Sequence, residues 1–320
     1  MTSSRRVLCL FGPTAVGKTD IAIEIASQIP ADLISVDSTL VYRGMDIGSA
    51  KPDEETLAAY PHQLVNIRDP ADGFSAAEFL NEADAAVEEA FKRNRLPLLV
   101  GGTMLYFRAF RDGLADLPSA NPKVRAEIQT RGEKQGWDVM HNELMEKDPI
   151  AGAQIHPNNH RRMVRALEVL QLSGRSLSSA WAEQQGAEER LKCHMIPVAV
   201  VPESRPLIHQ RVERRFEAML EHGFIDEVRS LMSQSHELLP AFRAVGYFEV
   251  WQYLNNEIGY DEMVDKAVAA SRQLAKKQFT WLNDWPEVTR FTGTNVTDVA
   301  AQILQYMESV AIISGPLGKS

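Results

Sequence analysis

The chain has 320 residues, a formal net charge of −9, 44% hydrophobic residues and 24% charged residues. These values are typical of a soluble globular protein with two modest domains, or with one domain that carries an insertion. The two cysteines argue against a disulfide framework and favour a cytoplasmic location, and no apolar run is long enough for a membrane span. A negative net charge disfavours binding to the phosphates of nucleic acids, so any such binding requires a local basic face.

A glycine-rich segment follows the first apolar run and fits the phosphate-binding pattern G-x-x-x-x-G-K-[ST]. Residues 7–11 before it have the pattern of a buried strand, and residues 20–29 after it have helical periodicity. In this context loop N–H groups and the helix N-terminus hold a phosphate, so the segment predicts a polyphosphate site. The Lys18 ammonium would contact the phosphate, and the Thr19 hydroxyl would reach a bound magnesium ion, Mg²⁺. The predicted loop consists of Gly12, Pro13, Thr14, Ala15, Val16, Gly17, Lys18 and Thr19.

Strand and helix patterns alternate over residues 1–116. After the first strand come strand patterns at residues 33–36 and 96–100, with a helix pattern at residues 79–94 between them. This alternation predicts an α/β fold in which a parallel sheet is flanked by helices, as in the P-loop NTPases.

The sequence changes character after this first part of the core. Residues 117–190 are charged and helix-rich without a strand pattern, which predicts an inserted all-helical domain. Strand composition returns near residues 194–201, so residues 191–310 are predicted to complete the core with one strand and a helical C-terminal part. Residues 311–320 are predicted to form a disordered tail.

Two polar residues follow predicted strands and are candidates for chemistry. Asp37 ends the second strand, and Thr103 follows Gly101 and Gly102 after the third. Ligands of open α/β sheets bind at the carboxyl ends of the strands, so both residues are expected near the phosphate loop. Asp37 could serve as an indirect Mg²⁺ ligand or a general base, and an Asp-Ser pair is equally typical of a turn or helix cap. The Thr103 hydroxyl could orient a nucleophile, although its position alone favours a helix cap.

Basic residues gather in three helical regions of this acidic chain. Arg161, Arg162 and Arg165 lie beside an apolar stripe that contains Met163, so these arginines are expected to point outward. Two further groups are Lys266, Arg272, Lys276 and Lys277, and Arg211, Arg214, Arg215 and Arg243. Such charges usually form a solvated helix face, but three groups also allow one basic surface for a polyanion. The irregular loop at residues 42–52 either covers a ligand or is a surface loop.

With these residues in hand, the sequence resembles the tRNA dimethylallyltransferases of bacterial type, which form the tRNA isopentenyltransferase or IPP transferase family. The C-terminal zinc finger of some eukaryotic members is not expected here. A phosphate loop alone is a broad signal, whereas the whole series of segments in family order is highly specific. The matching segments are residues 12–19, 35–38, 41–48, 50–52, 101–106, 156–158, 165–169, 243–247 and 278–282.

The resemblance implies transfer of a dimethylallyl group from dimethylallyl diphosphate to an adenosine of tRNA. The acceptor would be N6 of the adenosine 3′-adjacent to the anticodon, in tRNAs that read codons starting with U. Asp37 would be the general base toward N6, and Thr103 would position the reacting groups. The loop at residues 12–19 would hold the diphosphate, with Mg²⁺ beside Thr19. We expect a cytoplasmic monomer that binds the tRNA anticodon stem-loop and no membrane.

The resemblance also implies which residues contact tRNA, and the helical insertion at residues 117–190 contributes some of them. Phe248 and Asn283 stand where family members commonly carry arginine, so these positions bring less positive charge to tRNA. A base inside the anticodon loop reaches a buried pocket only when it leaves the stack, so base flipping is expected. The implied contact residues are Asp37, Ser38, Thr39, Leu40, Arg161, Arg162, Met163, Val164, Arg165, Arg243, Ala244, Val245, Gly246, Tyr247, Phe248, Lys276, Lys277, Gln278, Phe279, Thr280, Trp281, Leu282 and Asn283.

Three other functions remain open at this point. A small-molecule kinase shares the phosphate loop, the sheet and an inserted helical lid. A nucleotide switch or a tRNA-binding protein without chemistry would also carry these features. An adenylate isopentenyltransferase would act on free AMP, ADP or ATP, whereas the basic helical insertion favours tRNA.

Overall fold

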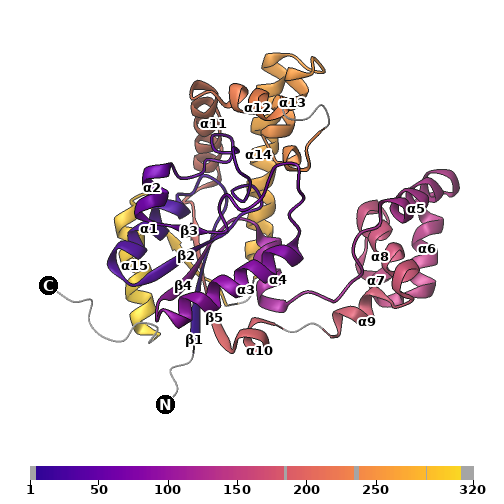
Figure 1. Ribbon diagram of the computed structural model, residues 1–320, viewed down its shortest axis with the longest axis horizontal. Coiled ribbons are helices and arrows are strands. Elements are labelled where there is room, and N and C mark those ends of the chain that lie inside the picture. Colours follow the sequence, from indigo (N-terminus) through magenta and orange to yellow (C-terminus); the bar gives the residue numbers. More distant parts are fainter. Residues whose placement is uncertain (1–4, 184–185, 234–237, 286, 311–320) are drawn as a thin grey trace. The chain divides into compact units, whose positions relative to one another are not determined.

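The computed structural model describes residues 5–183, 186–233, 238–285 and 287–310 (Figure 1). Within these residues six strands form one sheet in the order β3-β2-β4-β1-β5-β6, and each neighbouring pair is parallel. The parallel α/β sheet predicted from the sequence is therefore confirmed. The strands are β1 (Arg5–Phe11), β2 (Ala31–Val36), β3 (His62–Gln63), β4 (Leu96–Gly101), β5 (Cys193–Val201) and β6 (Thr289–Thr292).

The chain divides into two compact units. The sheet unit comprises the residues up to 111 and from 187 onward, and the helical unit comprises residues 112–186. Helices of the sheet unit are α1 (Lys18–Gln28), α2 (Glu54–Ala59), α3 (Ala76–Lys92), α4 (Met104–Asp112), α10 (Ala187–Leu191), α11 (Arg205–Glu221), α12 (Phe224–Met232), η1 (Pro240–Arg243), α13 (Tyr247–Leu254), α14 (Tyr260–Asn283) and α15 (Val296–Ser309). Helices of the helical unit are α5 (Pro122–Gln135), α6 (Trp137–Lys147), α7 (Pro149–Gln154), α8 (His160–Ser173) and α9 (Leu177–Trp181).

Strand β1 is central and buried on both faces, as its unbroken apolar sequence predicts. Leu8 and Leu10 point into one core layer, where they join side chains of α1 and α15. Phe11 packs on the other face against Phe107 of α4 and Trp285, with ring centroids 4.3 and 4.7 Å apart. Each such large apolar side chain contributes roughly 1.5–3 kcal/mol by leaving water, which fixes the strand that leads into the phosphate loop.

Helix α3 begins three residues earlier than the helical pattern predicts, because a capping box starts it. The Ser75 hydroxyl accepts a hydrogen bond from the Glu78 N–H, and the Glu78 carboxylate accepts one from the Ser75 N–H. This reciprocal pair satisfies two N–H groups that a helix start leaves without partners.

Two short strands were not predicted, and one of them corrects the expectation of helices alone after residue 205. Strand β6 interrupts that region and pairs with Val198–Val201 of β5. Among its residues only Phe291 is buried, so the apolar alternation is too short to recognise. Strand β3 is two residues long and pairs with Leu33 and Ile34 of β2.

The helical unit has its own apolar core, which includes Ile128, Met140, Leu144, Met163 and Leu167. No strand occurs in those of its residues that the structure describes. The unit contains residues 112–116, which we had placed in the core, whereas residues 187–190 group with the sheet unit. The predicted tail at residues 311–320 lies outside the described residues.

A buried carboxylate ties two helices of the helical unit together. Glu168 on α8 is fully buried and accepts hydrogen bonds from Arg165 at 2.6 Å, Arg125 at 3.0 Å and the Asn121 N–H at 2.7 Å. These three donors hold the pKa of Glu168 below its ordinary value, against the effect of burial. Arg165 therefore does not point freely outward, contrary to the expectation from the sequence.

None of the helices in the described residues combines the length and the hydrophobicity that crossing a membrane requires.

Candidate active site at the strand ends

The phosphate loop needs glycine at two positions for different reasons. An added Cβ at Gly12 would lie 2.6 Å from the Val200 carbonyl oxygen of β5, so no side chain fits there. Gly17 has a φ of +86°, a left-handed conformation that glycine adopts without strain, and helix α1 begins directly after it. The Lys18 ammonium donates a hydrogen bond to the Pro13 carbonyl at 2.7 Å and so closes the loop.

Two cations lie at this loop and lose much of their hydration. Burial lowers the pKa of Lys18 to about 8; nearby Asp37 raises it and Arg215 lowers it. Burial also lowers the pKa of Arg215, and Asp37 again opposes the shift. Buried charges are costly unless they are paired, so this arrangement favours binding of an anion.

The structure brings Asp37 and Thr103 together, as their positions after strands predicted. The Thr103 N–H donates to the Val36 carbonyl at 3.2 Å, and the Thr103 hydroxyl accepts from the Ser38 N–H at 3.1 Å. Thr103 thus holds the backbone on both sides of Asp37. One Asp37 oxygen, Oδ1, accepts from the N–H groups of Thr39 and Leu40 at 2.8 and 3.3 Å. The carboxylate is fixed by local hydrogen bonds while it still borders a cavity.

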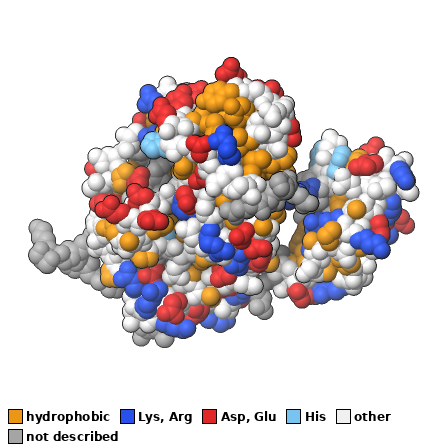
Figure 2. All heavy atoms as spheres, turned by 45° about the horizontal axis from the view of Figure 1, so that its top comes forward, with side chains coloured by type: hydrophobic (Ala, Val, Ile, Leu, Met, Phe, Trp, Pro, Cys, Tyr) orange, Lys and Arg blue, Asp and Glu red, His pale blue; other side chains and the backbone are white. Residues whose placement is uncertain are grey.

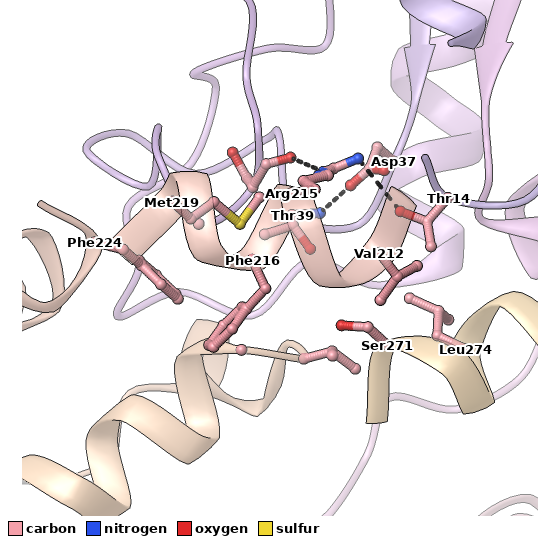
Figure 3. Close-up of a pocket in the computed structure, with 14 residues that line it drawn as sticks. Thr14, Asp37, Thr39, Val212, Arg215, Phe216, Met219, Phe224, Ser271 and Leu274 are labelled. Atoms are coloured by element: carbon pink, nitrogen blue, oxygen red, sulfur yellow. Dashed lines mark hydrogen bonds between the residues drawn. The ribbon is translucent and has the colours of Figure 1, made fainter. Parts of the chain in front are cut away.

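A small cavity of about 110 Å³ opens beside the phosphate loop. Figure 3 shows Thr14, Asp37 and Arg215 on one side of it, with Phe216 and Phe224 on the other. A ligand with an anionic part and a compact apolar part would match both sides. The lining residues are Thr14, Asp37, Thr39, Gly48, Ser49, Val212, Arg215, Phe216, Met219, Phe224, Val245, Gly246, Ser271 and Leu274.

Arg215 is a site residue that the sequence analysis did not single out. Its Nη1 lies 3.4 Å from the Thr14 hydroxyl and its Nη2 donates to the Ser49 carbonyl at 3.2 Å. We had grouped it with neighbouring surface arginines. The spacing in the sequence could have indicated its inward position. Arg215 lies three residues after buried Val212 and four before Met219, so the three side chains share the inner face of α11.

Part of the loop at residues 42–52 lines this cavity, and one carboxylate binds three successive N–H groups of the loop. Glu227 on α12 accepts hydrogen bonds from the N–H groups of Asp46, Ile47 and Gly48 at 2.8, 2.6 and 3.2 Å. The Tyr247 hydroxyl donates to the same carboxylate at 2.7 Å. An added Cβ at Gly48 would lie 2.0 Å from the Phe224 ring, so the loop packs without spare room.

Lys51 fixes the other end of this loop. Its side chain is 2% exposed, and its ammonium donates to the Tyr42 carbonyl, the Asp46 carboxylate and the Asn66 side-chain oxygen at 2.6–2.7 Å. A second cavity of about 570 Å³ is also lined by residues of this loop and shares Arg215 and Met219 with the first. The loop therefore lines both cavities, while Arg43, Gly44, Asp46 and Ala50 are exposed at the surface.

The segments with implied tRNA contacts contain buried as well as exposed residues. The buried residues Met163, Val164, Tyr247, Gln278 and Leu282 do not offer a surface to tRNA, whereas buried Gly246 borders the cavity. Phe248 stacks on Trp251, and Asn283 accepts a hydrogen bond from Arg290 at 3.1 Å. The exposed members are Ser38, Arg161, Arg162, Arg243, Lys276, Lys277, Thr280 and Asn283.

Positive charge does not dominate the visible surface. Figure 2 shows Lys and Arg side chains mixed with Asp and Glu over the face that it presents. Arg272 and Lys266 are each neutralised by a glutamate at 2.6 and 2.7 Å. Within the described residues no group of three or more His, Cys, Asp or Glu side chains could hold a metal ion.

Comparisons with known proteins agree on one family. The IPP transferase family model matches residues 40–285. The full-length tRNA isopentenylpyrophosphate transferase of Bacillus halodurans is 33% identical, with a TM-score of 0.69, over 97% of this chain and 99% of that one. The tRNA isopentenylpyrophosphate transferase of Staphylococcus epidermidis is 28% identical, with a TM-score of 0.68, over 96% of this chain and 99% of that one.

A more distant structure shares the fold. A eukaryotic dimethylallyltransferase that acts on tRNA is 24% identical, with a TM-score of 0.80, over 99% of this chain and 82% of that one. The family model spans well over half of the chain, and a relative above 30% identity covers almost all of it. This chain therefore belongs to the IPP transferase family.

Proposed function

We propose that this protein transfers a dimethylallyl group from dimethylallyl diphosphate to N6 of the adenosine 3′-adjacent to the anticodon, in tRNAs that read codons starting with U. One observation carries the proposal: Asp37 and Arg215 border the same cavity, beside a phosphate loop and opposite an apolar wall. The cations suit a diphosphate, the apolar wall suits a short prenyl group, and the carboxylate suits an amine that must lose a proton.

In this mechanism the N6–carbon bond forms as the allylic carbon–oxygen bond breaks. The diphosphate leaves with the bonding electron pair, and Asp37 accepts the N6 proton. Thr103 positions Asp37 through the backbone on both sides of it. Lys18 and Arg215 stabilise the charge on the leaving diphosphate, which is the larger electrostatic demand of the step. Base flipping would bring the adenine to Asp37.

The residues at the loop fit Mg²⁺ only together with the diphosphate. Thr19 lies at the start of α1 directly after Lys18 and is partly exposed. Mg²⁺ usually keeps several waters and binds through one or two protein groups plus substrate phosphates, which matches a lone hydroxyl ligand. A bound Mg²⁺ would neutralise charge on the leaving diphosphate.

We assign tRNA binding to the exposed basic residues of each unit. These residues are Arg161 and Arg162 in the helical unit, and Arg243, Lys276 and Lys277 in the sheet unit. Contacts to phosphates position the anticodon arm, whereas the cavity selects the base. We further propose that the protein acts in the cytoplasm as a monomer.

Labelled dimethylallyl diphosphate tests the function directly. With tRNA that carries unmodified adenosine, label is expected in tRNA and diphosphate in solution. Label in AMP in place of tRNA would indicate a free-nucleotide enzyme, and ADP release from ATP with a small acceptor would indicate a kinase. Absence of label from an unmodified anticodon stem-loop would refute the proposal.

The Asp37→Ala variant tests the general base. We expect kcat to fall by roughly 100- to 10,000-fold, the usual contribution of a positioned base, with tRNA affinity retained. Asp265→Asn on the exposed side of α14 is the matched control and should keep the parent rate. A near-normal rate in the Asp37→Ala variant would show that another group takes the proton.

A further inference from the structure

Gln278 on α14 uses both ends of its side-chain amide inside the protein. Its Oε1 accepts a hydrogen bond from the Thr14 N–H at 2.8 Å, and its Nε2 donates to the Gly102 carbonyl at 2.8 Å. The residue is 9% exposed. An amide turned by 180° would set oxygen against oxygen and N–H against N–H, so these partners fix its orientation.

The two partners of Gln278 belong to the two halves of the candidate site. Thr14 is part of the phosphate loop and contacts Arg215. Gly102 precedes Thr103, which holds the backbone on both sides of Asp37. One side chain therefore connects the place where the leaving group would sit to the place where the proton would be taken.

The contact also depends on the absence of a side chain at Gly102. An added Cβ at Gly102 would lie 2.5 Å from the Gln278 Nε2, so the glycine is needed for the amide to reach the carbonyl. The neighbouring residues Lys276 and Lys277 on α14 are exposed, whereas Gln278 points into the protein. Adjacent residues of α14 therefore have different environments, since the lysines face solvent and Gln278 bonds inside the protein.

We propose that Gln278 is a positioning residue that sets the separation between the phosphate loop and the Asp37–Thr103 pair, and that it does not contact tRNA. The proposal rests on the proposed prenyl transfer. A displacement near 1 Å between reacting groups can cost about 100-fold in rate. Loss of the Gln278 bridge should therefore lower kcat more than it raises the KM for either substrate.

The Gln278→Glu variant separates this role from simple packing, because its effect depends on pH. An ionised carboxylate accepts from Thr14 but cannot donate to the Gly102 carbonyl, whereas a neutral carboxyl group can do both. Burial raises the pKa of such a carboxyl group, whereas the nearby cations Lys18 and Arg215 lower it. Relative to the parent at each pH, kcat should therefore be lower by about 100-fold where the carboxyl group is ionised and should recover as the pH falls and it becomes neutral.

Three further variants complete the experiment, in which kcat and both KM values are measured by label transfer to an anticodon stem-loop. Gln278→Met keeps the length without either hydrogen bond and should lower kcat at every pH with little change in the KM for tRNA. Lys277→Ala should raise the KM for tRNA instead. Gln273→Glu, a change to an exposed glutamine one turn before Lys277 on the same helix, should keep the parent kcat across the pH range, and only its KM for tRNA should rise.

Two results would overturn the proposal. One is a Gln278→Met variant with normal kcat and a raised KM for tRNA, which would make Gln278 a tRNA contact. The other is a Gln278→Glu variant whose kcat equals that of the parent at every pH, which remains decisive even if Gln278→Met does not fold. If the parent protein itself transferred no label, the proposed function would be refuted. That outcome is distinct from the two results above, which concern only the variants of Gln278.

Discussion

The charge of Lys18 depends on the fold. Burial lowers its pKa to about 8, so the free protein loses this positive charge just above neutral pH. A bound diphosphate would raise that pKa again, and binding would therefore take up a proton. Affinity for dimethylallyl diphosphate is expected to decrease as pH rises above about 8, because the bound state then holds more protons than the free state.

Calorimetry at pH 8 in buffers of different ionisation enthalpy would measure this proton uptake. The Lys18→Arg variant is the control, because a guanidinium stays charged over the whole range and its affinity should not vary with pH for this reason. Equal pH dependence in the parent and in the Lys18→Arg variant would assign the titration to another group.

Residue-level prediction from the sequence succeeded where chain position was sufficient. Asp37 and Thr103 follow neighbouring strands of a parallel sheet, so their meeting follows from topology. Arg215 and Gln278 were placed among surface residues because their burial depends on which helices pack around them, and a single sequence does not specify that packing. Tyr247 was assigned to tRNA contact for the same reason, although it is fully buried against Glu227.

At the scale of elements, the loop at residues 42–52 depends on helix α12. Glu227→Gln keeps the size of the side chain but removes the charge that binds three successive N–H groups. Because hydrogen bonds to a charged group are worth about 1.5–3 kcal/mol each, we expect a loss of about 2 kcal/mol in the free energy of unfolding. The Ser49 carbonyl would also hold Arg215 less firmly, which should lower kcat/KM for dimethylallyl diphosphate.

Urea unfolding and steady-state kinetics would check both effects. Glu217→Gln on the exposed side of α11 is the matched control, with no expected change in either quantity. Unchanged kcat/KM in the Glu227→Gln variant would mean that the loop does not orient Arg215.

Long elements were predictable from periodicity, and short ones were not. The first strand and α3 have enough apolar residues to define a period, whereas β3 and β6 have two and four residues. Both short strands lie at the edges of the sheet, where their formation depends on the edge that β2 and β5 already provide.

For the whole molecule, the division into two units predicts separate local stabilities. Glu168→Gln would leave Arg125 and Arg165 without their shared carboxylate in the helical unit. We expect a loss of about 2 kcal/mol there, below the value for a fully buried pair because the arginines remain partly hydrated. Hydrogen exchange of α8 amides should accelerate by roughly 30-fold, with no change in β1. Equal acceleration in both units would show one cooperative unit.

The strand order also determines when the site can form during synthesis. Arg5 of β1 pairs with Cys193 of β5, and the entire helical unit is encoded between them. During translation β1 therefore leaves the ribosome long before β5 has been synthesised. Until then the edge of β1 that will pair with β5 has no partner strand. The helical unit has local contacts, so it can fold before β5 has been synthesised. Because Gly12 packs on Val200, the nascent chain completes its phosphate loop only after the insertion has been translated.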